Sequence, residues 1–363
     1  MIIVFRVDAS IQMGTGHVMR CLTLAHALEA SGAQCEFICR LTHGNLIEKI
    51  KLSGFKVYII GDDMISGQPE TSTESRSLSH SHWLDVSQEQ DAIDCLSILQ
   101  KIQPDWLVVD HYSLDKTWQD ILKPHFCALM VIDDLGDRAH IADVLLDQNY
   151  GATIKKYTDC VPQTCEILTG THYSLLRPEF FNWRQYSLDR RTNTESIQSI
   201  LITLGGSDPK NDTTKLLQQI STIPLPTQTK IIVVMGATAS HLTSVQNQAH
   251  GMSLDVEIKT DVSNMAELMS EADLAIGAAG STTWERCCLG LPTIQLVIAE
   301  NQRQAAEQLA KDNVVKLIES IEDLPEILIS ANQWISELSK NSQQVVDGLG
   351  ASRVAAHIIE NNI

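Results

Sequence analysis

The sequence predicts an α/β protein with two successive doubly wound, Rossmann-like domains that face each other across a cleft. Short apolar runs alternate with segments of helical period from residue 2 to residue 133, and again from residue 197 to residue 289. A polar stretch at residues 182–196 separates the two series and is expected to be an interdomain linker. The chain of 363 residues also exceeds the roughly 250 to 300 residues at which single cores stop growing.

The first series is expected to form five strands and four helices. The strands are expected at residues 2–7, 35–39, 56–60, 106–110 and 128–133, and the helices at 17–30, 45–52, 90–102 and 115–122. The polar residues 61–82 between them are expected to form a mobile loop. Together with the residues up to the linker, this series is expected to make an N-terminal domain of residues 1–182.

The second series is expected to form four strands and four helices, followed by helices near the C-terminus. The strands are expected at residues 197–204, 230–235, 254–259 and 274–277, and the helices at 213–220, 240–248, 265–271, 282–289, 304–311, 329–341 and 352–360. The predicted C-terminal domain spans residues 197–345, and a last helix within 346–363 is expected to pack back on the N-terminal domain. Doubly wound sheets bind ligands at the carboxyl ends of their strands, so a cleft between two such edges is the expected site.

Composition restricts the class of partner. The net charge of -18 argues against a nucleic-acid ligand, because a phosphate backbone requires a basic face. The nine cysteines include no C-x-x-C pair, which favours free thiols in a reducing compartment. No leader peptide and no apolar run of about 18 residues is apparent, so a cytoplasmic protein without a membrane partner is expected, as a monomer or weak oligomer.

The first motif with chemical potential follows the first predicted strand. It runs from Asp8 through Gly14 and Gly16 to His17 and Arg20. The two glycines allow a tight turn, and His17 then stands at the positive end of a helix, at the carboxyl edge of the sheet. Many such loops only turn the chain, and a single histidine is more often structural than catalytic. The grouping of Asp8, His17 and Arg20 around one loop nevertheless favours a substrate site.

The second motif follows a strand of the second series. Four small residues, Ala279, Gly280, Ser281 and Thr282, permit close approach of a ligand to backbone N–H groups that suit a diphosphate. Glu285 lies one turn into the helix and is expected to accept both ribose hydroxyls. A capped helix with Glu285 complementing its dipole is the alternative. A further turn at Gly206 ends another strand of the same domain and is expected to open onto the same edge.

Other polar residues lie at strand ends. Asp110, His111 and Tyr112 are expected to line the substrate site, although a turn that closes the strand is an equally good interpretation. His80 and His82 lie in the polar loop and are expected to be solvated. One interpretation of the neighbouring Trp83 is that it docks this loop as a lid over the cleft.

No metal and no cofactor are predicted. Asp133, Asp134, Asp137 and His140 lie close in sequence, but acidic residues at a strand end more often cap turns and helices than bind metal. The chain contains no Asp-x-Asp triplet, so a divalent cation has no obvious ligands of that kind for clamping a diphosphate.

Eight short stretches carry a resemblance to a known family. In order they are FRVDASIQMGTGHVMRC, VVDHYSLD, VIDDL, LLDQN, SLLRPEF, LGGSD, GAAGSTTWERC and ENQ. Their order and spacing, over roughly residues 2–315, resemble the UDP-sugar hydrolases of pseudaminic acid biosynthesis. That family hydrolyses UDP-2,4-diacetamido-2,4,6-trideoxy-β-L-altropyranose to UDP and 2,4-diacetamido-2,4,6-trideoxy-L-altrose. Its fold is similar to that of the GT-B transferase that adds N-acetylglucosamine to lipid-linked muramyl peptide.

The resemblance implies roles for individual residues. His17 would be the general base that activates water. Substrate or UDP contacts are implied for four side chains: Arg177, Glu285, Asn301 and Gln302. In the related transferases a backbone group before a helix reads uracil, and the matching position here is Val262.

The implied reaction is direct attack of water at the anomeric carbon, with C–O cleavage and inversion. UDP is a good leaving group, and the N–H groups at residues 279–282 would stabilise its developing charge. One general base is typically worth about 10² to 10⁴ in rate. The rival functions are a UDP-sugar glycosyltransferase on the same fold, a nucleotide-sugar epimerase and a non-catalytic nucleotide-sugar sensor.

Overall fold

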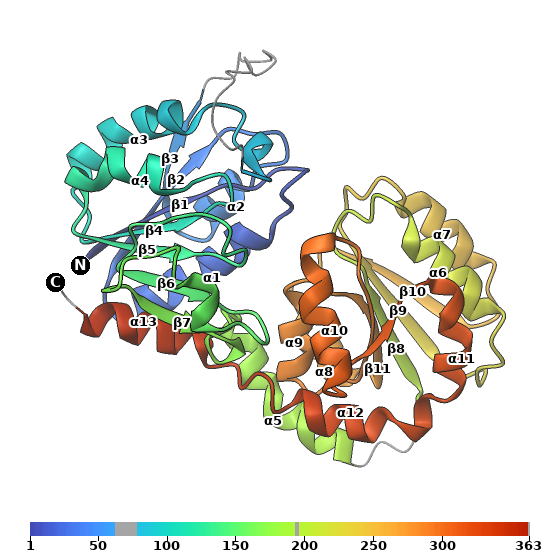
Figure 1. Ribbon diagram of the computed structural model, residues 1–363. Coiled ribbons are helices and arrows are strands. Elements are labelled where there is room, and N and C mark those ends of the chain that lie inside the picture. The colour runs from blue at the N-terminus through green and yellow to red at the C-terminus, as the bar shows by residue number, and fades with distance from the viewer. Residues whose placement is uncertain (62–77, 193–195, 362–363) are drawn as a thin grey trace. The chain divides into compact units, whose positions relative to one another are not determined.

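The computed structural model describes residues 1–61, 78–192 and 196–361, apart from the side chain of Asn301. The chain forms two compact units (Figure 1). The N-terminal unit comprises residues 1–175 and 349–363, and the C-terminal unit comprises residues 176–348. Each unit contains one parallel sheet between helices, which confirms the predicted class of an α/β protein with two doubly wound sheets.

The sheet of the N-terminal unit has the order β3-β2-β1-β4-β5-β6-β7. Its strands are β1 (Ile2–Val7), β2 (Gln34–Arg40), β3 (Lys56–Ile60), β4 (Trp106–Asp110), β5 (Ala128–Ile132), β6 (Val144–Asp147) and β7 (Glu166–Thr169). The central strands are near-continuous apolar runs because both of their faces are covered. The order reverses between β1 and β4, and the crevice outside the carboxyl ends at such a switch is where open α/β sheets bind ligands.

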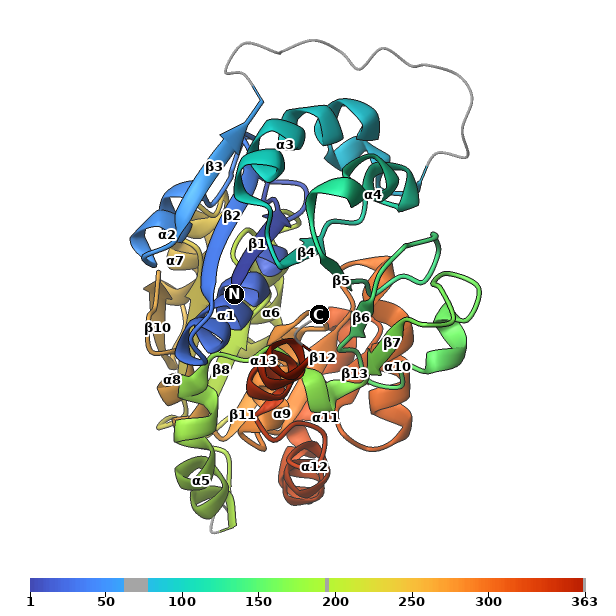
Figure 2. The same ribbon diagram turned by 90° about the vertical axis from the view of Figure 1, so that its left-hand side faces the viewer.

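Two layers of helices cover this sheet. Helices α1 (Gly16–Ala30), α2 (Ile47–Leu52) and α13 (Gly350–Glu360) share one core with the side chains of β1 that include Phe5 and Val7. Helices α3 (Gln88–Ile102) and α4 (Lys116–Leu122) share a second core with Val4 on the opposite face. Although α13 ends the chain, it lies beside α1 in both views (Figure 2).

The sheet of the C-terminal unit has the order β10-β9-β8-β11-β12-β13. Its strands are β8 (Ser199–Thr203), β9 (Lys230–Met235), β10 (Asp255–Thr260), β11 (Leu274–Ala278), β12 (Thr293–Leu296) and β13 (Lys316–Ile318). Its helices are α5 (Pro178–Thr192), α6 (Asp212–Ser221), α7 (Leu242–His250), α8 (Met265–Glu271), α9 (Thr282–Cys288), α10 (Arg303–Lys311), α11 (Leu324–Ile329) and α12 (Ile335–Ser342). The order again reverses at the first strand of the unit, between β8 and β11.

The stretch expected as a linker is largely helical. Helix α5 runs from Pro178 to Thr192, and residues 193–195 lie outside the described part of the chain. The helix is polar, and tertiary hydrogen bonds hold it in place. The buried guanidinium of Arg191 donates to the carbonyl oxygens of Met269, Ala272 and Leu289. These contacts join distant parts of the sequence, which explains why the polar composition suggested a linker instead.

Two further expectations can be compared with the structure. All nine cysteines are free thiols, as expected from their spacing. Among the described residues, no helix combines the length and the apolar character that crossing a membrane requires.

Candidate active site

His17 and Asp110 meet at the point where the order of the N-terminal sheet reverses. His17 lies in the first turn of α1, which follows β1 after the glycine loop, and Asp110 is the last residue of the adjacent strand β4. The distance between His17 Nδ1 and Asp110 Oδ1 is 2.6 Å. The Asp110 side chain is fully buried and that of His17 is 9% exposed. This pair therefore combines a fixed carboxylate with an imidazole at the edge of the interior.

Arg20 fixes the carboxylate from the other side. One turn along α1, its Nε donates to Asp110 Oδ2 at 2.6 Å and its second terminal nitrogen donates to Asp110 Oδ1 at 2.7 Å. Burial alone would raise the pKa of Asp110. The charge of Arg20 and the hydrogen bonds from Arg20 and His17 outweigh burial and hold that pKa well below its usual range. Asp110 is therefore ionised at every pH at which the protein is expected to work.

The ionised carboxylate determines the tautomer of His17. Asp110 carries no proton, so a contact of 2.6 Å requires that Nδ1 of His17 donates. Nε2 of the neutral ring is then the acceptor, and no described residue makes a hydrogen bond to it. A histidine held in this way can take a proton from a bound hydroxyl group, and the carboxylate stabilises the imidazolium that results.

Asp134, the second residue beyond β5, extends this cluster. Its Oδ2 accepts hydrogen bonds of 2.6 Å from both Arg20 and the hydroxyl of Tyr112. Its Oδ1 accepts from the amide of Asn149, which follows β6, at 3.1 Å. The carboxyl ends of β4, β5 and β6 thus supply one continuous polar network around His17.

Two of the expected site residues point into the interior instead. Asp8 is buried, and its Oδ1 accepts from Arg6 at 2.6 Å and from the backbone N–H of Arg40 at 2.7 Å. His111 is also buried, and its Nε2 lies 3.4 Å from Asp8 Oδ2. Burial lowers the pKa of His111. The side chains of Asp8 and His111 are thus both enclosed beneath the sheet edge, and their contact with substrate stays a prediction.

The loop before His17 has the tight turn expected from its glycines. Gly14 adopts a φ of 74°, and its N–H donates to the carbonyl of Ser10 at 2.8 Å. Both Gly14 and Gly16 are exposed, and no heavy atom lies within 4 Å of the position where a Cβ would stand. The positive φ of Gly14 is the physical reason for glycine there, and the open space beside both residues leaves their backbone accessible.

In the C-terminal unit, the small residues 279–282 connect β11 to α9. The start of α9 has no side-chain cap from Ser281. Backbone carbonyls already accept from the N–H groups of Ala279, Thr283 and Trp284, whereas no described residue accepts from those of residues 280–282. Arg286 lies beneath this loop and is fully buried. Its guanidinium donates to the carbonyl of Ala278 at 2.8 Å and to the hydroxyl of Thr282 at 3.1 Å, and its Nε has no partner among the described residues. Burial lowers the pKa of Arg286 to about 10.

Glu285 and Arg177 lie together beside the same helix. Nη2 of Arg177 lies 3.6 Å from Oε1 of Glu285 and 3.0 Å from Oε1 of Glu179. The Glu285 side chain is 17% exposed, and burial raises its pKa to about 7 despite the opposing effect of Arg177. Glu285 is thus a carboxyl group whose charge changes near neutral pH.

The other residues of the C-terminal unit that are expected to contact UDP lie in several separate turns. Gln302 approaches Gly280, with its Nε2 3.5 Å from the position of a Cβ there. Gly206 is exposed in the turn after β8, and its carbonyl accepts from the N–H of Gly236 at 3.0 Å. Val262 lies half-buried between β10 and α8. Asn301 lies in the turn Glu300–Gln302, but its side chain falls outside the described part of the structure.

The structure offers no metal centre within the described residues. Asp133 instead accepts from the backbone N–H groups of Leu135 and Gly136, at 3.1 and 3.0 Å, and pairs with Arg138 at 2.9 Å. It therefore closes a turn, as the sequence favoured.

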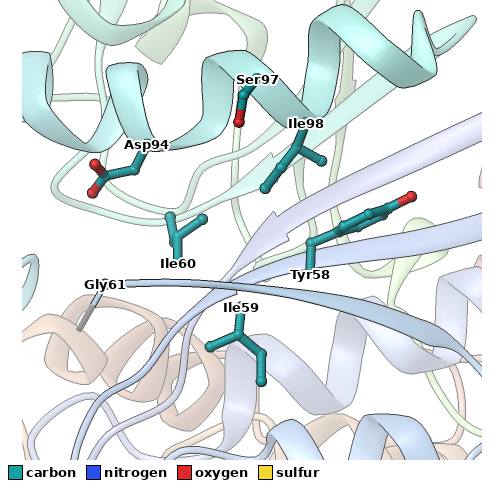
Figure 3. Close-up of a pocket in the computed structure, with 7 residues that line it drawn as sticks. All are labelled: Tyr58, Ile59, Ile60, Gly61, Asp94, Ser97 and Ile98. Carbon is teal, nitrogen blue, oxygen red and sulfur yellow. The ribbon is translucent and has the colours of Figure 1, made fainter. Parts of the chain in front are cut away.

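A surface hollow lies elsewhere on the N-terminal unit, between the end of β3 and α3 (Figure 3). It is lined by residues 58–61 and by Asp94, Ser97 and Ile98. Its acidic side chain, Asp94, already accepts from Arg40 at 2.6 Å. None of the predicted site residues lines this hollow.

Comparison with solved structures defines the class of fold. The chain is similar to the crystal structure of MurG from Acinetobacter baumannii, with a TM-score of 0.71 and 15% identity over 99% of each chain. The GT-B-like class predicted from the sequence is thereby confirmed. At this identity the likeness establishes the fold alone.

Sequence comparison gives more particular relatives. Residues 200–355 match the family described as the glycosyltransferase family 28 C-terminal domain. The UDP-2,4-diacetamido-2,4,6-trideoxy-beta-L-altropyranose hydrolase of Campylobacter jejuni is 27% identical over 85% of this chain and 96% of its own length. The uncharacterized protein MJ1062 of Methanocaldococcus jannaschii is 28% identical over 84% of this chain, which spans 57% of the length of that protein. The chain is thus homologous over most of its length to a protein named as a UDP-sugar hydrolase.

Proposed function

We propose that the protein hydrolyses UDP-2,4-diacetamido-2,4,6-trideoxy-β-L-altropyranose to UDP and the free sugar, with His17 as the general base. The observation that carries this proposal is the 2.6 Å contact between His17 Nδ1 and the buried, ionised Asp110, which leaves Nε2 as a proton acceptor. The homology to the Campylobacter jejuni hydrolase supports the choice of substrate.

In the proposed reaction, a water oxygen attacks the anomeric carbon while Nε2 of His17 takes one of its protons. The bond between the anomeric carbon and the β-phosphate oxygen breaks, and UDP leaves with the electron pair. Attack from the face opposite the leaving group inverts the anomeric configuration. The imidazolium is stabilised by Asp110 and returns its proton to solvent in the next step. Asp110 and Arg20 act as positioning residues, because they hold the ring and do not touch the water.

A UDP-sugar glycosyltransferase is the second candidate. The match of residues 200–355 to a glycosyltransferase family favours it, and the same base would activate a hydroxyl of an acceptor instead of water. The two functions differ in one requirement, since a transferase needs the acceptor and a hydrolase does not. A non-catalytic sensor would need neither and would release no UDP.

The proposal assigns the UDP moiety to the C-terminal unit. Glu285 would accept hydrogen bonds from the ribose hydroxyls, and the N–H groups of residues 280–282, next to Ala279, would bind the diphosphate. Four further contacts are proposed at Gly206, Val262, Asn301 and Gln302, with Arg177 beside Glu285. The proposal involves no cofactor and no metal.

The role proposed for Glu285 predicts a pH dependence of nucleoside binding. Ribose hydroxyls donate hydrogen bonds to a carboxylate, so uridine should bind preferentially to the ionised form of Glu285, whose pKa is about 7. The affinity for uridine is therefore expected to fall about tenfold between pH 8 and pH 6, as Glu285 takes up a proton. Uridine carries no phosphate that titrates in this range, and binding can be followed by NMR titration.

Two matched controls accompany this measurement. Glu285→Gln and the ligand 2′,3′-dideoxyuridine should each give weak binding that does not vary with pH. An affinity of the unmodified protein for uridine that is constant from pH 6 to pH 8 contradicts the assignment.

Arg286 provides a separate prediction about the diphosphate. Its side chain points back toward the start of α9 and adds positive charge where the helix dipole is already positive. No carboxylate pairs with it among the described residues, and a buried charge without a counter-ion is unfavourable. An anionic ligand at residues 279–282 would supply that counter-ion. Arg286→Met is therefore expected to weaken UDP binding by at least tenfold and uridine binding by less than threefold.

Arg191 is the matched control for Arg286. It is also buried, with its pKa lowered by burial to about 9, but its three donors reach carbonyls at the negative ends of α8 and α9. Arg191→Met should lower the free energy of unfolding by about 1 to 3 kcal/mol and leave the ratio of UDP to uridine affinity unchanged. The assignment is contradicted if that ratio is also unchanged in Arg286→Met. Calorimetric titrations and denaturant unfolding give both quantities.

The proposed function is tested by following UDP release with ³¹P NMR in buffer that contains no acceptor. The proposed substrate and UDP-N-acetylglucosamine are compared at equal concentrations. Rapid release of UDP from the proposed substrate alone is expected. UDP release that depends on an added acceptor would favour the transferase, and binding without any release would favour the sensor.

A further inference from the structure

We propose that Trp83, stacked on Tyr112 beside His17, forms an aromatic wall of the sugar subsite and binds an apolar face of an acetamido-deoxy sugar. This inference rests on the proposed function for the location of the sugar. It concerns a residue for which the sequence suggested only the docking of a loop.

The three rings form one continuous group. The Trp83 and Tyr112 rings are stacked, with centroids 5.6 Å apart and an interplanar angle of 22°. The His17 ring meets Tyr112 edge-on at 4.7 Å and Trp83 edge-on at 6.2 Å. The wall therefore stands next to the imidazole whose Nε2 is free to accept a proton.

The surroundings of Tyr112 hold the wall in place. The Tyr112 hydroxyl donates to Asp134 at 2.6 Å, which fixes the ring. The segment that carries Trp83 is attached through Ser113, whose hydroxyl donates to the carbonyl of His80 at 2.6 Å. The His80 ring packs against both Trp83 and Tyr112, with centroids at 4.5 and 5.3 Å. A preorganised wall loses little freedom when a ligand binds.

The exposure of the two rings differs in a way that favours a ligand. Tyr112 is buried, whereas Trp83 is half-buried and keeps part of its indole accessible. No described residue accepts a hydrogen bond from the indole N–H, although buried tryptophans normally find such a partner. Trp83 thus offers an aromatic surface and a free donor at one place.

An acetamido-deoxy sugar matches both features. Its ring C–H groups and methyl groups suit an aromatic face, and an acetamido oxygen can accept from the indole N–H. The wall would also keep bulk water away from one side of His17, so that the attacking water is held by Nε2 alone. A sugar that bears hydroxyl groups in place of the methyl and acetamido groups would lose these contacts and leave the indole N–H unpaired.

The test compares binding of the whole UDP-sugar with binding of UDP. Trp83→Ala is expected to raise the KM for the proposed substrate at least tenfold while the Kd for UDP changes less than twofold. Trp83→Phe should restore the KM to within about threefold, because it keeps an aromatic face. Trp183→Ala is the matched control and should change neither quantity, because Trp183 is another half-buried tryptophan, which packs on Tyr186 of α5.

Binding is also measured in the His17→Ala background, in which the proposed function predicts no turnover. The ratio of UDP-sugar to UDP affinity should still fall at least tenfold on replacing Trp83 by alanine. If neither the unmodified protein nor any variant hydrolyses the substrate but this ratio falls, the proposed function is contradicted and the inference about Trp83 is supported. If the ratio is unchanged, or if UDP and UDP-sugar are weakened equally, Trp83 only anchors its own segment and the inference is overturned.

Discussion

His17→Ala is expected to lower kcat for UDP-sugar hydrolysis by about 10² to 10⁴, which is the usual contribution of one general base. The affinity for UDP should stay within about twofold, because the nucleotide contacts are proposed for the C-terminal unit. Since the side chain is at the edge of the interior, the free energy of unfolding should change little compared with the loss of activity. Steady-state kinetics, UDP titration and denaturant unfolding measure the three quantities.

His26→Ala is the matched control for this variant. His26 lies on the same helix α1 but is exposed, and its ring packs on Phe55 at 4.8 Å. The variant should keep nearly full activity. A His17→Ala protein that folds, binds UDP and retains more than about a tenth of the original kcat would show that His17 is not the base.

Asp110→Asn is expected to lower kcat by about 10² to 10⁴, because Asp110 is proposed to position and stabilise the base His17. Oδ1 of Asp110 lies 2.6 Å from His17 Nδ1 and accepts from Arg20, and Oδ2 accepts from Nε of Arg20. If the new NH₂ group takes the place of Oδ1, it forces Nδ1 of His17 to accept, so the proton moves to Nε2 and the base is blocked. If it takes the place of Oδ2, it faces the Nε–H of Arg20, and two donors then oppose each other. In both orientations the negative charge that stabilises the imidazolium is lost.

The readout that separates positioning from simple structural damage is the division between kcat and binding. Asp110→Asn should lower kcat with little change in the affinity for UDP. Asp133→Asn is the control, since Asp133 is an equally buried carboxylate just beyond the neighbouring strand β5 whose partners are Arg138 and turn N–H groups. It should cost stability without a comparable loss of kcat. Equal losses of kcat in the two variants would contradict the role of Asp110.

Much of the fold could be predicted because its central strands and helices carry strong local patterns. Strands such as β1 and β4 are apolar runs of five or six residues that need no tertiary information. Strands β6, β7, β12 and β13 were not predicted. Each has only three or four residues, too few to show a period, and each becomes a strand by pairing with a neighbour. Helix α5 was missed because its polar surface is stabilised by distant carbonyl groups.

The candidate site was predictable only where a glycine loop or a strand end marked it. His17, Arg20, Asp110 and Tyr112 were predicted from such signals, and the structure brings them together. Asp8 shares the same signal but faces inward. Side chains two residues apart lie on the same side of an extended chain, so Asp8 lies on the side of the buried Arg6 and pairs with it. Sequence position alone does not distinguish the two faces of a strand that is buried on both.

Other residues of the candidate site could be recognised only once the fold was known. Asp134 and Asn149 follow β5 and β6, and only the pairing of these two strands places Asn149 beside Asp134, which in turn binds Arg20. Their position directly after apolar runs in VIDDL and LLDQN was the available signal. His80 was expected to be solvated, but it is half-buried against Trp83 and Tyr112, and burial lowers its pKa. Arg286 carried no signal, because a buried arginine cannot be told from an exposed one by spacing.

The central claim is that His17 activates water for attack at the anomeric carbon, and hydrolysis in H₂¹⁸O tests it most directly. The released UDP is examined by ³¹P NMR, in which ¹⁸O bound to phosphorus shifts the resonance. The account predicts that, without any acceptor, UDP is formed with no ¹⁸O and the label enters the sugar. Appearance of ¹⁸O in the β-phosphate, or release of UDP only when an acceptor is added, would contradict it.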